Sequence, residues 1–250
     1  MLKDKTIIVT GGASGIGEAA SVLFAGYGAN VVIADRNIEA AARCADRIGE
    51  RALAVATDVS DEDQVAAMVE ATLARFGRLD GAFNNAGVET LAQPLHEIDL
   101  ANWRRVMAVD LDGVFLCIKH QVRAMLAAGI CGSIVNTAST LSQVAMVNGS
   151  EYVAAKHGVL GLTRAAALDY APSGIRVNAV LPGVIHTAIM DRFAQIPEVA
   201  IKIDGMRAAH PIGRFGTPAE IAETAAWLLS DKSSFVTGTG ISADGGFQAQ

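Results

Sequence analysis

Short apolar runs rich in valine, isoleucine and alanine alternate along the chain with longer segments of helical composition. The apolar runs predict β-strands at residues 5–9, 30–34, 52–56, 79–83, 133–137, 176–181 and 240–243. The segments between them predict helices at residues 18–27, 38–49, 61–76, 100–128, 150–170 and 218–229. Repeated strand–helix units with short connections are typical of an α/β fold with a doubly wound parallel sheet, flanked by helices on both faces.

The stretch from residue 186 to residue 211 interrupts this alternation. It is too long for a simple connection, it is rich in Met, Ile and Phe, and it follows the end of a predicted strand. We therefore predict that residues 186–211 form a lid over a substrate site. The sequence contains no linker, repeat or low-complexity tract, so we predict that residues 1–250 form a single domain.

Composition and charge narrow the function. Of the 250 residues, 51% are hydrophobic, only 5% are aromatic and 25 are glycine, which suits parallel strands covered on both faces. The net charge of −6 argues against nucleic acid as a partner and provides no basic patch for a membrane surface. There is no 18-residue apolar run, and the first strand begins almost at once. We therefore expect no signal peptide and no transmembrane helix.

The three cysteines, Cys44, Cys117 and Cys131, are scattered and lack the spacing of metal ligands, and the five histidines form no cluster. An odd, scattered set of this kind indicates reduced thiols and a cytoplasmic protein. The sequence therefore predicts no metal site.

A glycine-rich turn follows the first predicted strand, with the sequence Thr10-Gly11-Gly12-Ala13-Ser14-Gly15-Ile16-Gly17. Because the turn connects a strand to a helix, its glycines would let the backbone approach a pyrophosphate and the helix N-terminus would supply N–H donors. The second predicted strand is followed by Asp35, whose carboxylate can accept hydrogen bonds from the hydroxyls of an adenosine ribose. The alternative for Asp35 is a cap on the next helix.

Tyr152 and Lys156 lie four residues apart in the helix predicted for residues 150–170, so the phenol and the ammonium share one face. A phenol with a reference pKa of about 10 is a poor base at neutral pH, but a neighbouring cation favours the phenolate. Alone, such a pair is commonly a surface pair on an amphipathic helix. The interpretation changes because Ser139 follows an apolar strand thirteen residues before Tyr152, and because the glycine turn is present.

Five motifs occur in the order and at the spacing of the short-chain dehydrogenase/reductase family: residues 10–17; Asn84-Asn85-Ala86-Gly87; Ser139; Tyr152 with Lys156; and Pro182-Gly183 with Thr187. The chain resembles the compact members of this family over nearly its whole length. It looks most like bacterial NAD-dependent dehydrogenases of cyclic alcohols and dihydrodiols. The resemblance implies a Rossmann fold and an NAD(P)-dependent alcohol dehydrogenase or ketone reductase.

The resemblance also implies a catalytic role for three side chains. Tyr152 would exchange a proton with the substrate oxygen while hydride moves between the carbinol carbon and the nicotinamide. Ser139 would hydrogen-bond the same oxygen, unless its hydroxyl only caps the strand end. Lys156 would favour the phenolate and hold the nicotinamide ribose.

A larger set of residues is assigned to the cofactor by the same resemblance. Asp58 would meet the adenine amino group, and Val59 would supply a backbone contact. Asn85 and Gly87 would either line the adenosine ribose or hold the strand end. The full set is Gly11, Ser14, Ile16, Gly17, Asp35, Asp58, Val59, Asn85, Gly87, Tyr152, Lys156, Pro182, Gly183, Ile185 and Thr187.

Asp35 also favours NAD over NADP, because a carboxylate would repel a 2′-phosphate. Ser14 occupies a position at which NADP-preferring relatives commonly carry a basic residue. Arg36 could accept a phosphate if Asp35 turned away. On balance we predict a preference for NAD of at least about tenfold.

One position departs from the family pattern. Members commonly have an asparagine seven residues after a tryptophan, whereas Asp110 stands at that spacing from Trp103. By resemblance, this residue holds a water in line with Lys156 that feeds protons to the tyrosine. Asp110 could keep this role and alter the pH profile, because a carboxylate can titrate where an amide cannot. The alternative is a tolerated isostere.

The substrate site is expected next to the catalytic residues and in the lid. Its aliphatic and thioether lining predicts an uncharged secondary alcohol or its ketone. Gln143, Glu151 or Glu89 could form a hydrogen bond with a second hydroxyl of the substrate, as in a diol. The expected lining residues are Leu141, Gln143, Val144, Val184, Ile189, Met190, Phe193 and Met206.

Two other classes of function remain open. An NADPH-dependent reductase of 3-ketoacyl groups on a carrier protein is favoured neither by Asp35 nor by the net charge. A non-catalytic NAD-binding regulator would be expected to have lost Ser139, Tyr152 or Lys156, and all three are present. We expect a small-molecule alcohol or ketone as the partner. By resemblance we also expect a homotetramer, in which the long helix and the Tyr152 helix pack across subunits.

Overall fold

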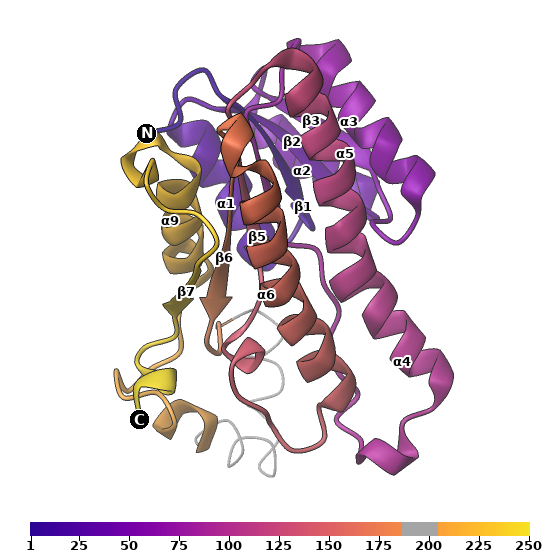
Figure 1. Cartoon of the computed structure of the whole chain (residues 1–250), viewed down its shortest axis with the longest axis vertical. Helices are drawn as coiled ribbons and strands as arrows, with labels where there is room; N and C mark the ends of the chain where they lie inside the picture. The colour runs from indigo at the N-terminus through magenta and orange to yellow at the C-terminus, as the bar shows by residue number, and fades with distance from the viewer. Residues whose placement is uncertain (187–204) are drawn as a thin grey trace.

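The computed structural model describes residues 1–186 and 205–250, which are arranged around one parallel sheet (Figure 1). The strand order is β3-β2-β1-β4-β5-β6-β7, and all neighbours pair in parallel. The predicted doubly wound α/β fold is therefore confirmed. The strands are β1 (Thr6–Thr10), β2 (Asn30–Asp35), β3 (Ala52–Ala56), β4 (Gly81–Asn84), β5 (Ser133–Thr137), β6 (Arg176–Pro182) and β7 (Gly240–Ala243).

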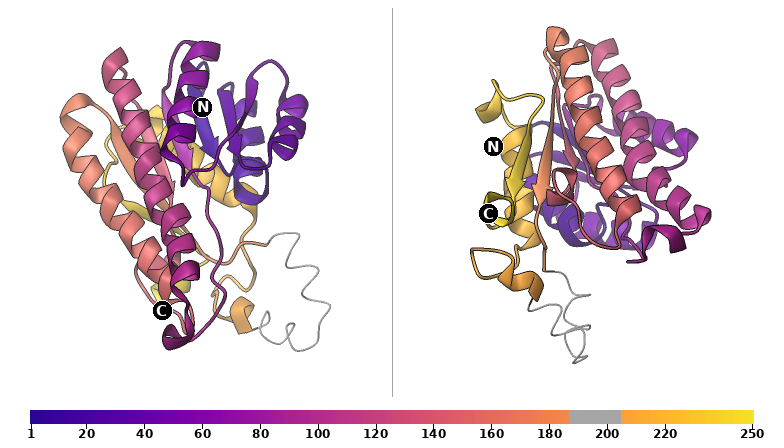
Figure 2. Two further views of the ribbon diagram at one scale, coloured as in Figure 1. Left: turned by 90° about the vertical axis from the view of Figure 1, so that its right-hand side faces the viewer. Right: turned by 60° about the horizontal axis from the view of Figure 1, so that its bottom comes forward.

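Successive strand residues point to opposite faces of the sheet and build two apolar cores. Ile8 and its neighbour Val32 pack with residues of α3 (Glu62–Phe76), α5 (Gly113–Ala128) and α6 (Ser150–Tyr170). Ile7 and Val31 pack on the other face with α1 (Gly15–Gly26), α2 (Ile38–Ile48) and α9 (Pro218–Leu229). The two helical layers lie on either side of the sheet in Figure 2.

Most helices begin at a side chain that accepts a hydrogen bond from the first turn. Asn37 caps α2, Asp61 caps α3, Asp99 caps α4 (Leu100–Met107) and Thr217 caps α9. Helix α1 differs from these four, because its N-cap residue Ser14 makes no such bond. The first N–H groups of α1 are therefore left for another acceptor. Within the described ranges, none of the helices combines the length and the apolar character needed to cross a bilayer.

The helix predicted for residues 100–128 is present, but it contains a π-helical turn that the sequence did not predict. Helix α4 ends at Met107, a π-helical turn occupies Ala108–Asp112, and α5 continues from Gly113. A π turn contains one residue more than an α-helical turn and is often found at functional sites. Asp110 lies within it. The strand predicted for residues 79–83 is also displaced, to Gly81–Asn84, whereas the other predicted strands and helices are present close to their expected positions.

The chain order reverses between β1 and β4 at the centre of the sheet. From β1 the chain proceeds through β2 to β3 on one side, and it returns on the other side of β1 as β4. Thr10 and Asn84 pair across this boundary. Loops that leave the two strand ends diverge, which opens the crevice where ligands bind in sheets of this kind.

Candidate active site

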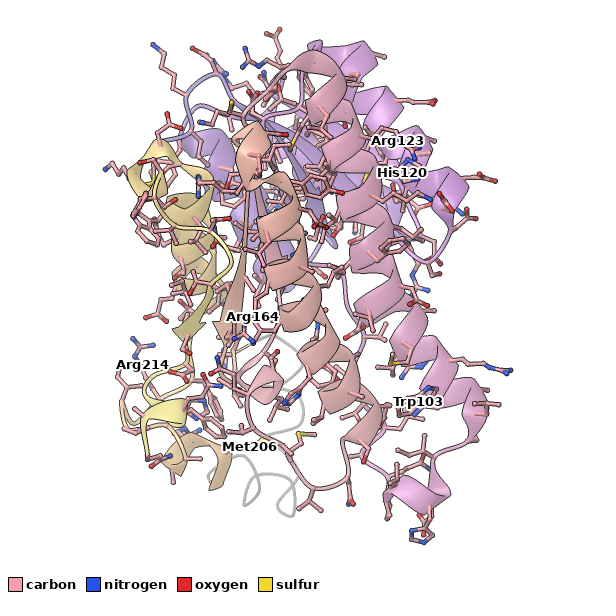
Figure 3. All side chains as sticks on the ribbon, viewed as in Figure 1. Trp103, His120, Arg123, Arg164, Met206 and Arg214 are labelled. Atoms are coloured by element: carbon pink, nitrogen blue, oxygen red, sulfur yellow. The ribbon has the colours of Figure 1, made fainter. Side chains whose placement is uncertain are left out.

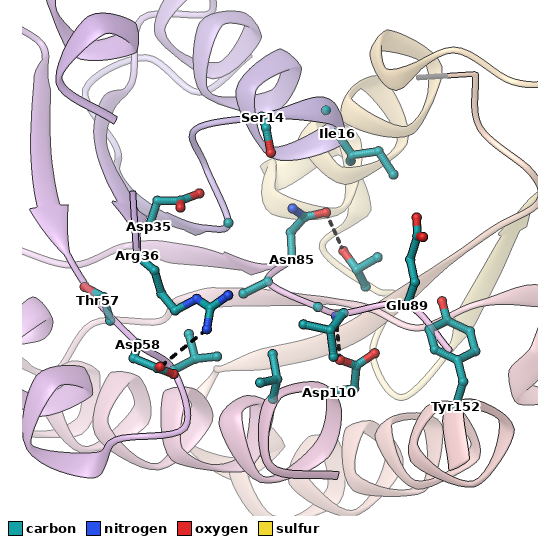
Figure 4. Close-up of a pocket in the computed structure, with 18 of the residues that line it drawn as sticks. Ser14, Ile16, Asp35, Arg36, Thr57, Asp58, Asn85, Glu89, Asp110 and Tyr152 are labelled. Carbon is teal, nitrogen blue, oxygen red and sulfur yellow. Dashed lines mark hydrogen bonds and ion pairs between the residues drawn. The ribbon is translucent and has the colours of Figure 1, made fainter. Parts of the chain in front are cut away.

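A cavity of about 430 Å³ opens at the carboxyl ends of strands β1 to β5 (Figure 4). It brings together most residues that the sequence analysis assigned to the cofactor and to proton transfer. These are Gly11, Ser14, Ile16, Asp35, Asp58, Val59, Asn85, Gly87, Asp110, Tyr152 and Lys156. Lining residues that the sequence analysis did not assign to the cofactor or the catalytic set are Gly15, Arg36, Thr57, Ala86, Val88, Glu89, Val109 and Thr137.

The glycine turn forms one wall of this cavity, and two of its glycines, Gly11 and Gly17, leave no space for a side chain. A Cβ atom on Gly17 would lie 2.0 Å from the carbonyl oxygen of Gly11. Gly11 has a φ of +62°, and a Cβ atom there would lie 2.9 Å from the Cα atom of Ala86. The turn is thus packed directly on the segment after β4, and the uncapped start of α1 at Ser14 faces the cavity. A helix N-terminus of this kind binds an anion such as a pyrophosphate.

Asp35 is held at the edge of the cavity by two backbone donors. Its Oδ2 atom accepts from the N–H of Ala13 at 3.1 Å, and its Oδ1 atom accepts from the N–H of Asn37 at 2.9 Å. The side chain that caps α2 is Asn37 rather than Asp35. Each Asp35 oxygen keeps a lone pair that can accept a hydrogen bond from a hydroxyl group.

Arg36 and Asp58 form the outer end of the cavity. The Nη1 atom of Arg36 lies 3.8 Å from Oδ2 of Asp58, whereas Asp35 points toward the glycine turn (Figure 4). Beside this pair, Oγ1 of Thr57 is buried without a hydrogen-bond partner. The sequence analysis missed Thr57. Its only sequence signal is its position directly before Asp58.

Asn85 both lines the cavity and ties strand ends together. Its side chain donates to the carbonyl oxygen of Thr10 at 3.3 Å and accepts from the hydroxyl of Thr137 at 3.2 Å. Gly87, two residues later, lies where a Cβ atom would be 3.5 Å from Asp110 and 3.6 Å from Nζ of Lys156. Asn85 can therefore both line the cavity and hold the strand end, which are the two roles considered for it.

Lys156 and Tyr152 share one face of α6, and Lys156 is buried, so they are not a surface pair. The Nζ atom lies 5.4 Å from the centroid of the Tyr152 ring, 3.2 Å from the carbonyl oxygen of Thr137 and 3.3 Å from Oδ2 of Asp110. Burial lowers the pKa of the ammonium, but the negative charges of Tyr152 and Asp110 outweigh it and raise the pKa above its ordinary value. Lys156 therefore stays a cation, and a cation there attracts a phenolate more strongly than a phenol.

Asp110 is completely buried and connects Lys156 to the segment after β4. Its Oδ1 atom accepts a hydrogen bond of 2.7 Å from the N–H of Val88, whereas Oδ2 faces Lys156 and has no hydrogen-bond partner. An asparagine could accept the same N–H, but it could not supply the negative charge. Asp110 therefore contributes to the electrostatics of the site as well as to its packing.

Ser139 begins a short 3-10 turn, Thr140–Ser142, that packs against α6. Its Oγ atom accepts from the N–H of Leu141 at 3.1 Å, and its own N–H donates to Oγ of Ser142 at 3.1 Å. The hydroxyl therefore caps the turn while its hydrogen stays available for donation to another oxygen. Ser139 and Leu141 are not among the residues that line the cavity.

The predicted substrate residues are not all brought together. Gln143 and Val144 line a separate hollow with Val153 and His157, on a face of α6 that does not carry Tyr152. Thr187, Ile189, Met190, Phe193 and most of the predicted lid lie outside the described residues.

The segment after β6 lines a second cavity, of about 320 Å³, together with residues of β7 and the chain that follows it. Gly183, Val184 and Ile185 belong to this lining, and Pro182 is the last residue of β6. Met206 lies at the same end of the molecule, within a short helical segment at residues 205–208, and is 50% exposed (Figure 3). Pro182, Gly183 and Ile185, the described residues among those predicted to clasp the nicotinamide, are thus close together in the chain, but they do not line the first cavity.

His210 holds this second region together, and the sequence analysis assigned it no role. Its Nε2 atom accepts from the N–H of Val184 at 3.1 Å, and its Nδ1 atom lies 2.8 Å from the carbonyl oxygen of Met206. Together these bonds assign the neutral ring with its hydrogen on Nδ1. The ring is buried between Phe215 and Phe247.

Comparison with known proteins supports the chemistry suggested by this geometry. A family model described as enoyl-(acyl carrier protein) reductase matches residues 11–248. The 2,5-dichloro-2,5-cyclohexadiene-1,4-diol dehydrogenase of Sphingobium indicum is 48% identical over 248 residues, which are 99% of this chain and 98% of that protein. The cis-4-hydroxycyclohexanecarboxylate dehydrogenase of Sinomonas cyclohexanicum is 49% identical over 248 residues, which are 98% of this chain and 97% of that protein. The chain belongs to the short-chain dehydrogenase/reductase family.

Solved structures of other dehydrogenases and reductases extend this assignment to the fold. The crystal structure of levodione reductase matches this short-chain dehydrogenase/reductase with a TM-score of 0.94 and 39% identity, covering 100% of this chain and 99% of that chain. The 3-ketoacyl-(acyl-carrier-protein) reductase of Brucella melitensis, complexed with NADH, matches with a TM-score of 0.90 and 36% identity over 99% of each chain. This short-chain dehydrogenase/reductase is therefore an oxidoreductase of the alcohol dehydrogenase and ketone reductase type with a nicotinamide cofactor.

Proposed function

We propose that this enzyme interconverts a cyclic secondary alcohol and its ketone with NAD, and that Tyr152 is its general acid and base. The observation that carries the proposal is that Tyr152 and the buried cation Lys156 line the same cavity as the uncapped glycine turn. A phenol beside a buried ammonium is equipped to move a proton, and a turn of this kind is equipped to hold a dinucleotide. Both curated relatives named above are dehydrogenases whose names describe hydroxylated six-membered rings, which supports a cyclic substrate.

In this mechanism each residue has a separate task. The Oη atom of Tyr152 takes the hydroxyl proton of the alcohol, or returns it to the oxygen of the ketone. Ser139 donates its hydroxyl hydrogen to that oxygen and orients it. Lys156 stabilises the phenolate and keeps ammonium hydrogens beyond the one bonded to Thr137 for the hydroxyls of the cofactor ribose. The nicotinamide, when bound, supplies or accepts the hydride.

The residues present fit a nicotinamide dinucleotide. The glycine turn provides a cradle that a Cβ atom would fill, and the start of α1 lacks a side-chain cap. Asp35 is fixed beside that turn by the N–H of Ala13, so a 2′-phosphate would meet a carboxylate. Arg36 is paired with Asp58 instead of standing free beside Asp35. These contacts support a preference for NAD over NADP of at least about tenfold.

A reductase of carrier-bound 3-ketoacyl groups is the second candidate. The Brucella melitensis structure favours it, and the description of the matching family model names another reductase of carrier-bound acyl groups. Such an enzyme would prefer NADPH and would need a basic surface for an acidic carrier protein. The anchored Asp35 carboxylate and the net charge of −6 support the alcohol dehydrogenase instead.

The test is initial-rate NADH or NADPH formation by purified protein with NAD⁺ or NADP⁺, against cyclohexanol, cyclohexanediols, an aryl alcohol and a linear secondary alcohol. We expect cyclic alcohols and NAD⁺ to give the highest kcat/KM. Tyr152→Phe should lower kcat by at least about a hundredfold, because it removes the group that transfers the proton, while NADH binding is retained.

Three outcomes would contradict this proposal. An NADP⁺/NAD⁺ ratio of kcat/KM near or above one would exclude the NAD preference. Undiminished turnover by Tyr152→Phe would exclude the general base. Absence of turnover with every alcohol, despite tight NADH binding, would instead favour the non-catalytic regulator.

We further propose a homotetramer, assembled in part through a groove between α5 and α6. Phe115 and Leu126 line this groove and are 48% and 46% exposed. Leu162 of α6 also lines it, whereas Val159 and Leu160 are buried in the core of the subunit. An apolar groove flanked by exposed large side chains is a surface that a second helix pair can cover.

A further inference from the structure

The segment that leaves β4 is fixed at three successive residues. The N–H of Val88 donates to Asp110 at 2.7 Å, the carbonyl oxygen of Glu89 accepts from Nη2 of Arg105 at 2.8 Å, and the hydroxyl of Thr90 donates to Oε1 of Glu151 at 2.7 Å. Asp110 and Glu151 are both completely buried. Hydrogen bonds thus anchor the chain at Glu89 and at the residues on either side of it, and two of the three partners are completely buried carboxylates.

The side chain of Glu89, in contrast, is not engaged by any of these groups. It lines the same cavity as Tyr152, and in Figure 4 the carboxylate and the phenol hydroxyl project to the same side. In the part of the chain that the structure describes, no side chain donates to this carboxylate or pairs with it. A carboxylate acceptor is thus presented from an anchored segment into the cavity that Tyr152 lines.

The other polar residues considered for a second substrate hydroxyl do not occupy this position. Glu151 is buried, and its Oε1 atom is already bonded to Thr90 and to Nδ2 of Asn102. Gln143 lines the separate hollow on another face of α6. Of the three residues, Glu89 alone shares a cavity with Tyr152.

We propose that Glu89 is a specificity-determining residue that accepts a hydrogen bond from a second hydroxyl of the substrate. The inference rests on the proposed alcohol dehydrogenase function and deepens it, because it selects neutral cyclic diols and polyols as the substrate class. The same carboxylate repels a substrate that bears a carboxylate of its own. This enzyme should therefore discriminate against hydroxycyclohexanecarboxylates, the type of compound in the name of the Sinomonas cyclohexanicum relative.

The test compares Glu89→Gln and Glu89→Ala with the wild type on three substrates: cyclohexanol, cyclohexanediol (1,2 and 1,4 isomers) and cis-4-hydroxycyclohexanecarboxylate. Glu89→Ala should lower kcat/KM for the preferred diol by about ten- to a hundredfold, because it removes a charged acceptor. Turnover of cyclohexanol should change by less than about threefold. Glu89→Gln keeps an oxygen acceptor and should recover part of the diol activity. Both variants should raise kcat/KM for the hydroxycarboxylate, since they remove the negative charge.

Glu97→Gln is the matched control, because Glu97 is an exposed glutamate between β4 and α4 that lies 3.7 Å from His96 and does not line this cavity. This control should leave kcat/KM for all three substrates unchanged. Equal losses for the diol and cyclohexanol in Glu89→Ala would show a general role in folding or cofactor binding and would overturn the proposal. Unchanged diol kinetics would overturn it as well.

A binding measurement separates this inference from the proposed function. Calorimetric titration of cyclohexanediol and cyclohexanol into Tyr152→Phe loaded with NAD⁺ reports recognition without turnover. Tighter binding of the diol that disappears in the Glu89→Ala/Tyr152→Phe double variant supports the role of Glu89 even if no alcohol is oxidised by the wild type. Equal binding of both alcohols would overturn that role even if oxidation is observed.

Discussion

Asp110 shows how much one side chain determines in this site. One of its oxygens fixes the N–H of Val88, and the other faces the ammonium of Lys156. These two contacts distinguish the two hypotheses for residue 110, an altered pH profile and a tolerated isostere. An isosteric amide would preserve the first contact, but it would remove the charge that acts on Lys156. The carboxylate is therefore expected to change the titration of the site relative to an asparagine.

Asp110→Asn should move the alkaline limb of the kcat/KM profile to lower pH. Burial lowers the pKa of Lys156, and the charges of Tyr152 and Asp110 raise it above its ordinary value. When the charge of Asp110 is removed, the effect of burial on the pKa of Lys156 is opposed less strongly. The pKa falls, and the ammonium loses its proton at a lower pH. The measurement is kcat/KM with NAD⁺ across neutral and alkaline pH.

The same substitution should change the pH dependence of stability in a defined direction. A lysine whose pKa is raised on folding stabilises the folded state below its unfolded pKa of about 10.4, and this contribution is lost as the pH rises through the folded value. The stability difference between wild type and Asp110→Asn should therefore shrink at alkaline pH. Asp112→Asn, an exposed change in the same π turn, is the control. Identical alkaline limbs for Asp110→Asn and wild type would restore the isostere interpretation.

At the scale of elements, the strands and most helices could be predicted because their signals are local. The alternation of apolar runs and capped helical segments depends on residues that are close together in the sequence. Asp61 and Thr217, for example, are recognisable as helix caps before the fold is known. The π turn at Ala108–Asp112 could not be predicted in this way. Its buried residue Asp110 contacts Val88 and Lys156, which lie far away in the sequence.

His210 links two elements, and its removal should destabilise the enzyme. It accepts the N–H of Val184 after β6 and bonds to the carbonyl oxygen of Met206 in the following helical segment. His210→Ala would leave the half-buried N–H of Val184 without its acceptor and a space between two aromatic rings. We expect the free energy of unfolding to fall by about 2–4 kcal/mol.

Urea unfolding measures this effect, and His157→Ala on the exposed side of α6 is the control, with an expected change within about 0.5 kcal/mol. Because Val184 lies next to Gly183 in the segment predicted to clasp the nicotinamide, His210→Ala should also raise the KM for NAD⁺. If His210→Ala unfolds at the same urea concentration as the wild type, the link between these elements does not contribute to stability.

At the scale of the whole molecule, the residues assigned to the cofactor meet in one cavity more completely than the residues assigned to the substrate do. Asp35, Asp58 and Asn85 follow strand ends, and parallel strands bring their carboxyl ends to one edge of the sheet. The directions of loops depend instead on tertiary contacts. Gln143 therefore lies in a separate hollow. The choice of Glu89 over Glu151 as the proposed substrate contact depends on the hydrogen bond from Thr90 to Glu151, which the sequence does not reveal.

Assembly is the last property that can be tested at this scale. If the groove between α5 and α6 is a subunit interface, Phe115→Asp together with Leu126→Asp would replace apolar contacts by buried carboxylates on both sides of a symmetric contact. Light scattering should then show the mass of four chains for the wild type and a smaller species for the double variant. Leu95→Asp, at a leucine that is 67% exposed and lies outside the groove, should leave the mass unchanged.

Dissociation should also lower the activity. Helix α6 carries Tyr152 and Lys156 on one face, whereas Leu162 and Ala165 line the groove on another. We expect kcat to fall in the smaller species even though no catalytic residue is altered, since the helix that positions both residues loses its outer support. A wild type that scatters light as a monomer, or a double variant that remains a tetramer, would show that this groove is not an interface.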